Sequence, residues 1–112
     1  MSYLKAKKLS ELLISKGMSI AIAESCTGGS LSSSLTSIPG ASNYFNCGFI
    51  TYSNESKISM LNVDPNSIKL FGAVSEKVAS EMAMGAGNNS NSNLAISVTG
   101  AVSYTHLRAH ET

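Results

Sequence analysis

Short apolar runs alternate with helix-like segments along this 112-residue chain, and this alternation is the strongest constraint on its fold. The runs at 18–23, 44–53 and 94–100 are rich in isoleucine, alanine, valine and aromatic residues, as is typical of buried strands. Segments with helical periodicity or helix caps lie between them. Strands that alternate with helices form βαβ units, so the sequence predicts an α/β domain with a largely parallel sheet.

Capping residues predict where several helices begin and end. Gly17 is placed to end a helix over residues 4–16, and a helix over 76–87 is expected to give way to a polar loop at 88–93. N-caps are predicted at Ser53 or Asn54, at Asp64 before Pro65, and at Ser75.

Composition excludes several classes of function. Only 13% of the residues are charged and the net charge is +1, with no basic stripe, so we expect no nucleic-acid partner. No apolar run approaches the roughly 20 residues that span a bilayer, and no signal-peptide core follows the basic N-terminus. We therefore expect a cytoplasmic protein without a membrane partner, in which Cys26 and Cys47 are reduced thiols and Cys47 lies in the core.

Both histidines and the single arginine lie in the last seven residues. The first 105 residues must therefore carry any chemistry with lysine, serine, cysteine, tyrosine and carboxylates. His106 and His110 stand four residues apart, which would make a metal pair on a helix, but no third ligand accompanies them. We expect no metal and no cofactor.

The segment 23–30, AESCTGGS, follows the first predicted strand and precedes a helix. Ligands of parallel sheets bind beyond the carboxyl ends of the strands, so this turn lies where a site is expected. Three interpretations are open: a loop holding Ser25 or Cys26 as a nucleophile, a glycine-rich phosphate cradle, or a capped turn. Glu24 could act as an acid or base, or its carboxylate could fix the turn by accepting backbone N–H bonds.

Lys57 is the candidate base for Ser25. It is the only lysine between Lys16 and Lys69 and lies in the first turn of a predicted helix, where the helix dipole disfavours an ammonium. Partial burial would also favour the neutral amine, which can accept a proton from a serine. Tyr52, at the end of the second strand, could hydrogen-bond either residue and relay a proton.

Four segments together resemble one known family. AESCTGG, GFITYSNESK, GAVSE and SVTGA occur in an order and with spacings similar to those of the C-terminal domain of the CinA family, known as nicotinamide-nucleotide amidase. The resemblance covers residues 4–101. It implies a three-layer α/β/α domain that hydrolyses the carboxamide of nicotinamide mononucleotide without a metal. It also implies Ser25 as nucleophile, Lys57 as base and Tyr52 as a supporting residue.

The same resemblance implies a nucleotide-binding role for further residues. Backbone N–H groups of the loop would hold the oxyanion, and several residues are placed to bind the phosphate or ribose. The candidates are Cys26, Thr27, Gly28, Gly29, Thr99 and Gly100. The partner would be a small-molecule nucleotide, and the complete protein would be a homo-oligomer. The alternative is a non-catalytic nucleotide-binding or interaction module.

The segment 102–112, VSYTHLRAHET, departs from the family pattern. It resembles the translated read-through of a sequencing adapter, so we expect an amidase-like domain over 1–101, incomplete at its C-terminal end, and a non-native tail. We also expect the chain to be unstable or weakly active, because missing strands would leave a sheet edge and apolar faces uncovered.

Overall fold

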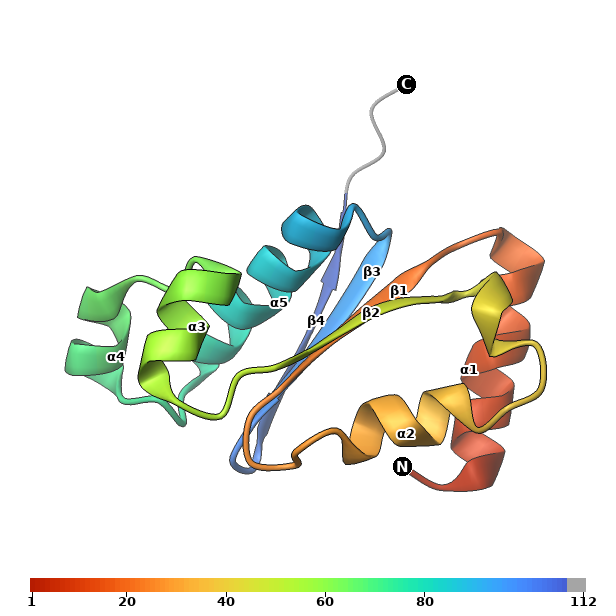
Figure 1. Cartoon of the computed structure of the whole chain (residues 1–112), viewed down its shortest axis with the longest axis horizontal. Coiled ribbons are helices and arrows are strands. Elements are labelled where there is room, and N and C mark those ends of the chain that lie inside the picture. The colour runs from red at the N-terminus through yellow and green to blue at the C-terminus, as the bar shows by residue number, and fades with distance from the viewer. Residues whose placement is uncertain (109–112) are drawn as a thin grey trace.

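A four-stranded sheet with the order β2-β1-β3-β4 runs through the centre of the protein in a computed structural model, which describes residues 1–108 (Figure 1). The strands are β1 (Ile20–Glu24), β2 (Phe45–Ile50), β3 (Leu94–Thr99) and β4 (Val102–Leu107). β1 pairs in parallel with both β2 and β3, whereas β4 is antiparallel to β3. The carboxyl ends of β1, β2 and β3 therefore meet at one edge of the sheet.

Helices cover both faces of this sheet (Figure 1). α1 (Tyr3–Lys16) and α2 (Ser30–Thr36) lie on one face, and a short 3-10 turn, η1 (Ala41–Asn43), precedes β2. α3 (Asn54–Leu61), α4 (Pro65–Phe71) and α5 (Glu76–Ser90) lie on the other face. The predicted three-layer α/β fold with a largely parallel sheet is confirmed.

Strand β1 divides its side chains between two cores. Ile20 and Ile22 belong to the apolar cluster under α1 and α2, whereas Ala21 and Ala23 belong to the cluster under α3 and α5. All four residues are fully buried. Because successive side chains of a strand point to opposite faces, Glu24 continues toward α2 and Ser25 toward α3.

The predicted caps are present. Gly17 ends α1 in the left-handed conformation, with φ of 61°. The Ser53, Asp64 and Ser75 side chains each accept a backbone N–H bond at the start of α3, α4 and α5. Capping chemistry thus fixes the start of the helix that carries Lys57.

The prediction of a loop at 88–93 is wrong for residues 88–90, because α5 continues to Ser90. Gly87 does not end the helix but lies within it, and a Cβ there would make an ordinary van der Waals contact of 3.5 Å with the Ala95 side chain. The helix ends instead at Asn91, which adopts the left-handed conformation with φ of 57°. The tightly packed glycine of this helix is Gly85, where a Cβ would clash with the backbone of Leu61 at the end of α3.

The structure contains β4 where only a tail was expected. The expected boundary at Ala101 falls in the tight turn between β3 and β4, and residues 102–107 pair with β3 along its whole length. His106 lies in this strand, so the helical pairing with His110 is wrong for His106, while His110 lies outside the described residues. That residues 102–112 are non-native stays a prediction.

Within residues 1–108, no helix is long and apolar enough to cross a membrane.

Candidate active site

Ser25 and Lys57 meet at the carboxyl edge of the sheet. Lys57 Nζ lies 2.9 Å from Ser25 Oγ, although the two residues are 32 positions apart in the chain. Lys57 is 1% exposed and Ser25 is 8% exposed. The pair that the sequence analysis nominated is therefore in contact and removed from bulk water.

Two backbone carbonyls complete the surroundings of the amine. Lys57 Nζ donates to the carbonyl oxygens of Thr51 at 2.9 Å and Tyr52 at 3.1 Å. A neutral amine has two N–H donors and one lone pair, and a carbonyl can only accept. With both N–H groups directed to the carbonyls, the lone pair faces the Ser25 hydroxyl, which is the orientation that a general base needs.

Burial lowers the pKa of the Lys57 amine, and the nearby Cys26 thiol opposes this shift only in part. Burial has this direction because removal from water disfavours the charged form. All three hydrogen-bond partners of Nζ are neutral groups. The site therefore favours the amine that can accept a proton from Ser25.

Glu24 precedes Ser25 in the chain, but its side chain lies on the opposite face of the sheet, against α2. Its fully buried carboxylate accepts backbone N–H bonds from Leu31 and Ser32, both at 2.9 Å, and the Ser32 hydroxyl at 2.7 Å. Burial alone would raise the pKa of this carboxyl, but the bonds from Ser32 and Leu31 together hold the pKa below its usual value. Of the alternatives for Glu24, the structure supports the carboxylate that fixes the turn.

The same contact bears on the phosphate-cradle interpretation. The Glu24 carboxylate occupies the first-turn amides of α2 at Leu31 and Ser32, which a bound phosphate would otherwise use. Nearer to Ser25, the Gly28 N–H donates to the Ser25 carbonyl at 3.2 Å. Within the described residues, the N–H groups of Cys26, Thr27 and Gly29 have no acceptor. These three amides are the oxyanion donors that the loop can offer.

Cys26 and Tyr52 are both exposed at the site. The Cys26 thiol lies 3.7 Å from the Gly100 carbonyl oxygen, and the Tyr52 side chain is 73% exposed. Tyr52 contacts Lys57 through its backbone carbonyl, not its hydroxyl. Cys47, predicted to be buried, is only partly so, because β2 is an edge strand.

Thr99 and Gly100 form the other side of the site. The Thr99 hydroxyl is buried and donates to the Ala73 carbonyl at 2.8 Å, so it is engaged within the fold. Gly100 has φ of 61°, and a Cβ there would lie 2.6 Å from the Val74 side chain. Glycine is therefore required at the turn that closes this side.

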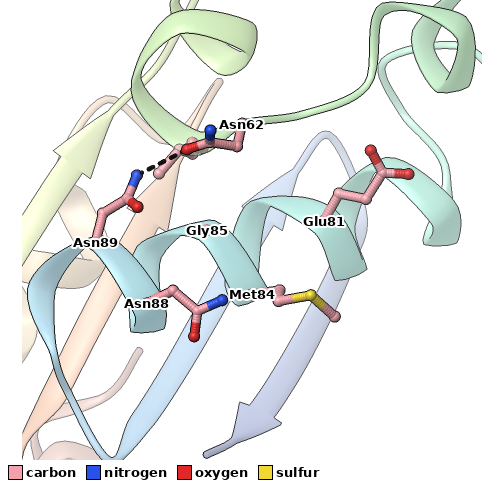
Figure 2. A pocket seen from close by; sticks show the side chains of 7 residues that line it. Asn62, Glu81, Met84, Gly85, Asn88 and Asn89 are labelled. Atoms are coloured by element: carbon pink, nitrogen blue, oxygen red, sulfur yellow. Dashed lines mark hydrogen bonds between the residues drawn. The ribbon is translucent and has the colours of Figure 1, made fainter.

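A depression of about 300 Å³ lies elsewhere, between the end of α3 and α5 (Figure 2). Glu81 accepts bonds from the Asp64 N–H and the Ser67 hydroxyl, and Asn89 donates to Asn62 and to the Met60 carbonyl. Its polar groups thus hold helices together. The lining residues are Leu61, Asn62, Glu81, Met84, Gly85, Asn88 and Asn89.

Within residues 1–108, no three or more His, Cys, Asp or Glu side chains lie together in a group that could hold a metal ion. The sequence did not predict the two carbonyl acceptors of Lys57. Every residue type has a backbone carbonyl, and only the backbone conformation determines where that carbonyl points.

Comparison with known proteins identifies relatives over most of the chain. The model of the CinA C-terminal domain matches residues 3–109, which extends past the expected boundary at 101. A CinA-like protein from Chloroherpeton thalassium is 54% identical over 92 residues, covering 82% of this chain and 22% of that protein. A CinA-like protein from Chlorobium limicola is 52% identical over 89 residues, covering 80% and 21%. The chain thus spans about a fifth of the length of these curated relatives.

Solved structures agree with this assignment. The competence damage-inducible protein A from Klebsiella pneumoniae superposes with a TM-score of 0.86 at 31% identity, over 88% of this chain and 61% of that chain. The competence/damage inducible protein CihA from Agrobacterium tumefaciens gives a TM-score of 0.85 at 40% identity, over 88% and 59%.

Proposed function

Because this chain belongs to the CinA C-terminal domain family, we propose that it is a serine amidase that hydrolyses the carboxamide of nicotinamide mononucleotide. The products would be nicotinate mononucleotide and ammonia. The observation that carries this proposal is the 2.9 Å contact between Ser25 Oγ and the buried Lys57 amine. A serine beside a buried lysine whose neutral form is favoured is an activated nucleophile.

The first step is acylation of Ser25. Lys57 Nζ takes the hydroxyl proton as Oγ attacks the amide carbon, and the tetrahedral oxyanion is held by the free N–H groups of Cys26, Thr27 and Gly29. The protonated Lys57 then gives its proton to the leaving nitrogen, and ammonia departs. Its two carbonyl partners hold the amine in place through both proton transfers.

Water completes the reaction by deacylation. Lys57, neutral again, takes a proton from the water that attacks the ester carbon. It then returns this proton to Ser25 Oγ as the tetrahedral intermediate collapses to the free acid and Ser25. Tyr52 is proposed as a supporting group at the mouth of the site, where its exposed phenol can reach the substrate. Thr27, Gly28, Gly29, Thr99 and Gly100 are proposed to line the nucleotide subsite, with Thr99 contributing backbone groups because its hydroxyl is engaged.

The test is ammonia release from nicotinamide mononucleotide by the purified chain. We expect Ser25→Ala and Lys57→Met to lower kcat by about a thousandfold or more, since each removes half of the nucleophile–base unit. The matched controls are Ser33→Ala and Lys69→Met, which replace exposed residues on α2 and α4.

Three outcomes would contradict the proposal. Activity of Ser25→Ala equal to that of the unmodified chain would remove the serine mechanism. Nucleotide binding without any turnover would favour the non-catalytic module. Turnover of other carboxamides but not of this nucleotide would keep the amidase and reject the substrate.

A further inference from the structure

Three hydroxyl side chains form a row across the carboxyl edge of the sheet. Glu24 pairs with Ile50 on one side and with Val98 on the other. One residue further, the Thr51 N–H donates to the Glu24 carbonyl at 2.8 Å and the Ser25 N–H donates to the Val98 carbonyl at 3.0 Å. The pairing therefore continues, and it places Thr51, Ser25 and Thr99 side by side.

The row faces α3 and α5. Neighbouring residues in register on parallel strands present their side chains on the same face. Ser25 reaches Lys57 of α3, and Thr99 reaches the Ala73 carbonyl just before α5. Thr51 thus lies beside Ser25 on the face that carries the Lys57 amine.

Thr51 differs from the other two members of the row because its hydroxyl has no partner. The residue is 0% exposed, and its Oγ1 is one of two buried side-chain oxygens without a hydrogen bond among the described residues. The other belongs to Thr27, beside the Glu24 carboxylate. A buried hydroxyl without a partner destabilises a fold, so its presence beside a reactive group requires an explanation.

Lys57 cannot be the missing partner. Its Nζ already has three neighbours: Ser25 Oγ and the carbonyls of Thr51 and Tyr52. Thr99 is likewise engaged with Ala73. The remaining polar atom in the row is Ser25 Oγ, which can accept a second donor besides Lys57 Nζ as its proton passes to the amine.

We propose that Thr51 is a further catalytic residue, whose hydroxyl donates a hydrogen bond to Ser25 Oγ as the serine loses its proton to Lys57. Adjacent strands lie about 4.8 Å apart, and hydroxyl side chains of neighbouring residues in register can hydrogen-bond across this spacing. The proposed bond therefore requires the Thr51 side chain to rotate toward Oγ during the reaction. A hydrogen bond to an atom that is gaining negative charge is stronger than one to a neutral hydroxyl. Thr51 thus lowers the barrier to acylation. This inference rests on the proposed Ser25–Lys57 mechanism.

The experiment measures the reactivity of Ser25 without its substrate. The full chain is treated with a fluorophosphonate, which phosphonylates activated serines, and the labelling rate is followed by intact mass across pH. We expect Thr51→Val to lower the limiting rate by about tenfold or more, as expected for loss of one charge-assisted bond, without moving the midpoint of the pH profile. Thr51→Ser, which keeps the hydroxyl, should label at nearly the original rate.

Thermal unfolding of the same variants separates function from structure. Because the Thr51 hydroxyl has no partner, Thr51→Val should unfold at the same temperature as the unmodified chain or higher. Thr99→Val, the isosteric control whose hydroxyl is engaged, should unfold at a lower temperature.

Several results would overturn the inference. A Thr51→Val chain that labels at the original rate, or that loses stability as Thr99→Val does, contradicts it directly. A shifted pH midpoint with an unchanged limiting rate would show that Thr51 acts on Lys57 instead. A chain whose Ser25 does not label at all overturns this inference and the proposed mechanism together, whereas labelling without turnover of the nucleotide overturns only the proposed substrate.

Discussion

Glu24 and Lys57 are both buried ionisable residues at the same edge of the sheet, on opposite faces and on either side of Ser25. Burial opposes the charged form of each. The pKa of Glu24 is nevertheless lowered, which preserves its charge, whereas the pKa of Lys57 is lowered, which favours its neutral form. The ionised form is therefore favoured for Glu24, and the neutral amine that the proposed mechanism requires is favoured for Lys57.

The difference lies in the partners. Glu24 accepts two backbone N–H groups and a hydroxyl at the start of α2, and these donors together outweigh the effect of burial. Lys57 has only carbonyls and a hydroxyl, and no carboxylate contacts its amine among the described residues. Glu24 holds the loop in shape with its charge, and Lys57 lacks a counter-charge that would keep it protonated.

Replacing Glu24 should have the largest effect on stability. Glu24→Gln keeps the shape but introduces an amide NH₂ among N–H donors, so we expect the free energy of unfolding to fall by about 2–3 kcal/mol. Urea denaturation at neutral pH measures the loss. Glu11→Gln, at an exposed position on α1, should change stability by less than about 0.5 kcal/mol. Equal stability of both variants would show that the Glu24 contacts contribute nothing net.

The sign of the pH dependence follows from the lowered pKa of Glu24. Its contribution is fully present above its ordinary pKa of 4.5 and is lost as pH falls through the lower pKa of the folded state. The difference in stability between the unmodified chain and Glu24→Gln should therefore shrink in acid.

The sequence predicted the elements of this site better than its details. Capping residues and apolar runs located β1, β2 and β3 and the starts of α3, α4 and α5, because these signals are local, whereas β4 was not predicted. Ser25 and Lys57 could be nominated because the absence of histidine from the first 105 residues left few candidates. The carbonyl partners of Lys57 and the unpartnered Thr51 hydroxyl depend on strand register, which no short stretch of sequence specifies. For the same reason, the close approach of Gly85 to the Leu61 backbone could not be predicted.

The pH dependence of activity tests whether the pKa of Lys57 is lowered. Since burial lowers the pKa of this amine below its ordinary value of 10.5, the active neutral form is present at lower pH than for an exposed lysine. We expect kcat/KM to rise about tenfold per pH unit until the lowered pKa is reached and then to level off. Measurement of initial rates across pH gives the midpoint, and a midpoint at 10.5 or above would contradict the role of burial.

The lowered pKa of Lys57 should also make the stability of the fold rise with pH. A lysine whose pKa is lowered in the folded state binds fewer protons there than in the unfolded chain, so its burial costs least above pH 10.5 and most below the lowered pKa. As pH rises through this window, the free energy of unfolding of the unmodified chain should therefore increase relative to that of Lys57→Met. Parallel curves for the two proteins would show that Lys57 titrates alike when folded and unfolded.

The smallest effect is expected at Cys26, which separates the two nucleophiles that the sequence left open. The thiol is exposed and its one contact, at 3.7 Å from the Gly100 carbonyl oxygen, is weak, whereas its backbone N–H is retained by any replacement other than proline. We therefore expect Cys26→Ala to change kcat by less than about threefold and unfolding by less than about 0.5 kcal/mol. Because the thiol raises the pKa of Lys57, the midpoint of the pH profile should move slightly downward in this variant. Loss of turnover in Cys26→Ala, together with retention in Ser25→Ala, would transfer the nucleophile to the thiol and leave Lys57 as the base for a different atom.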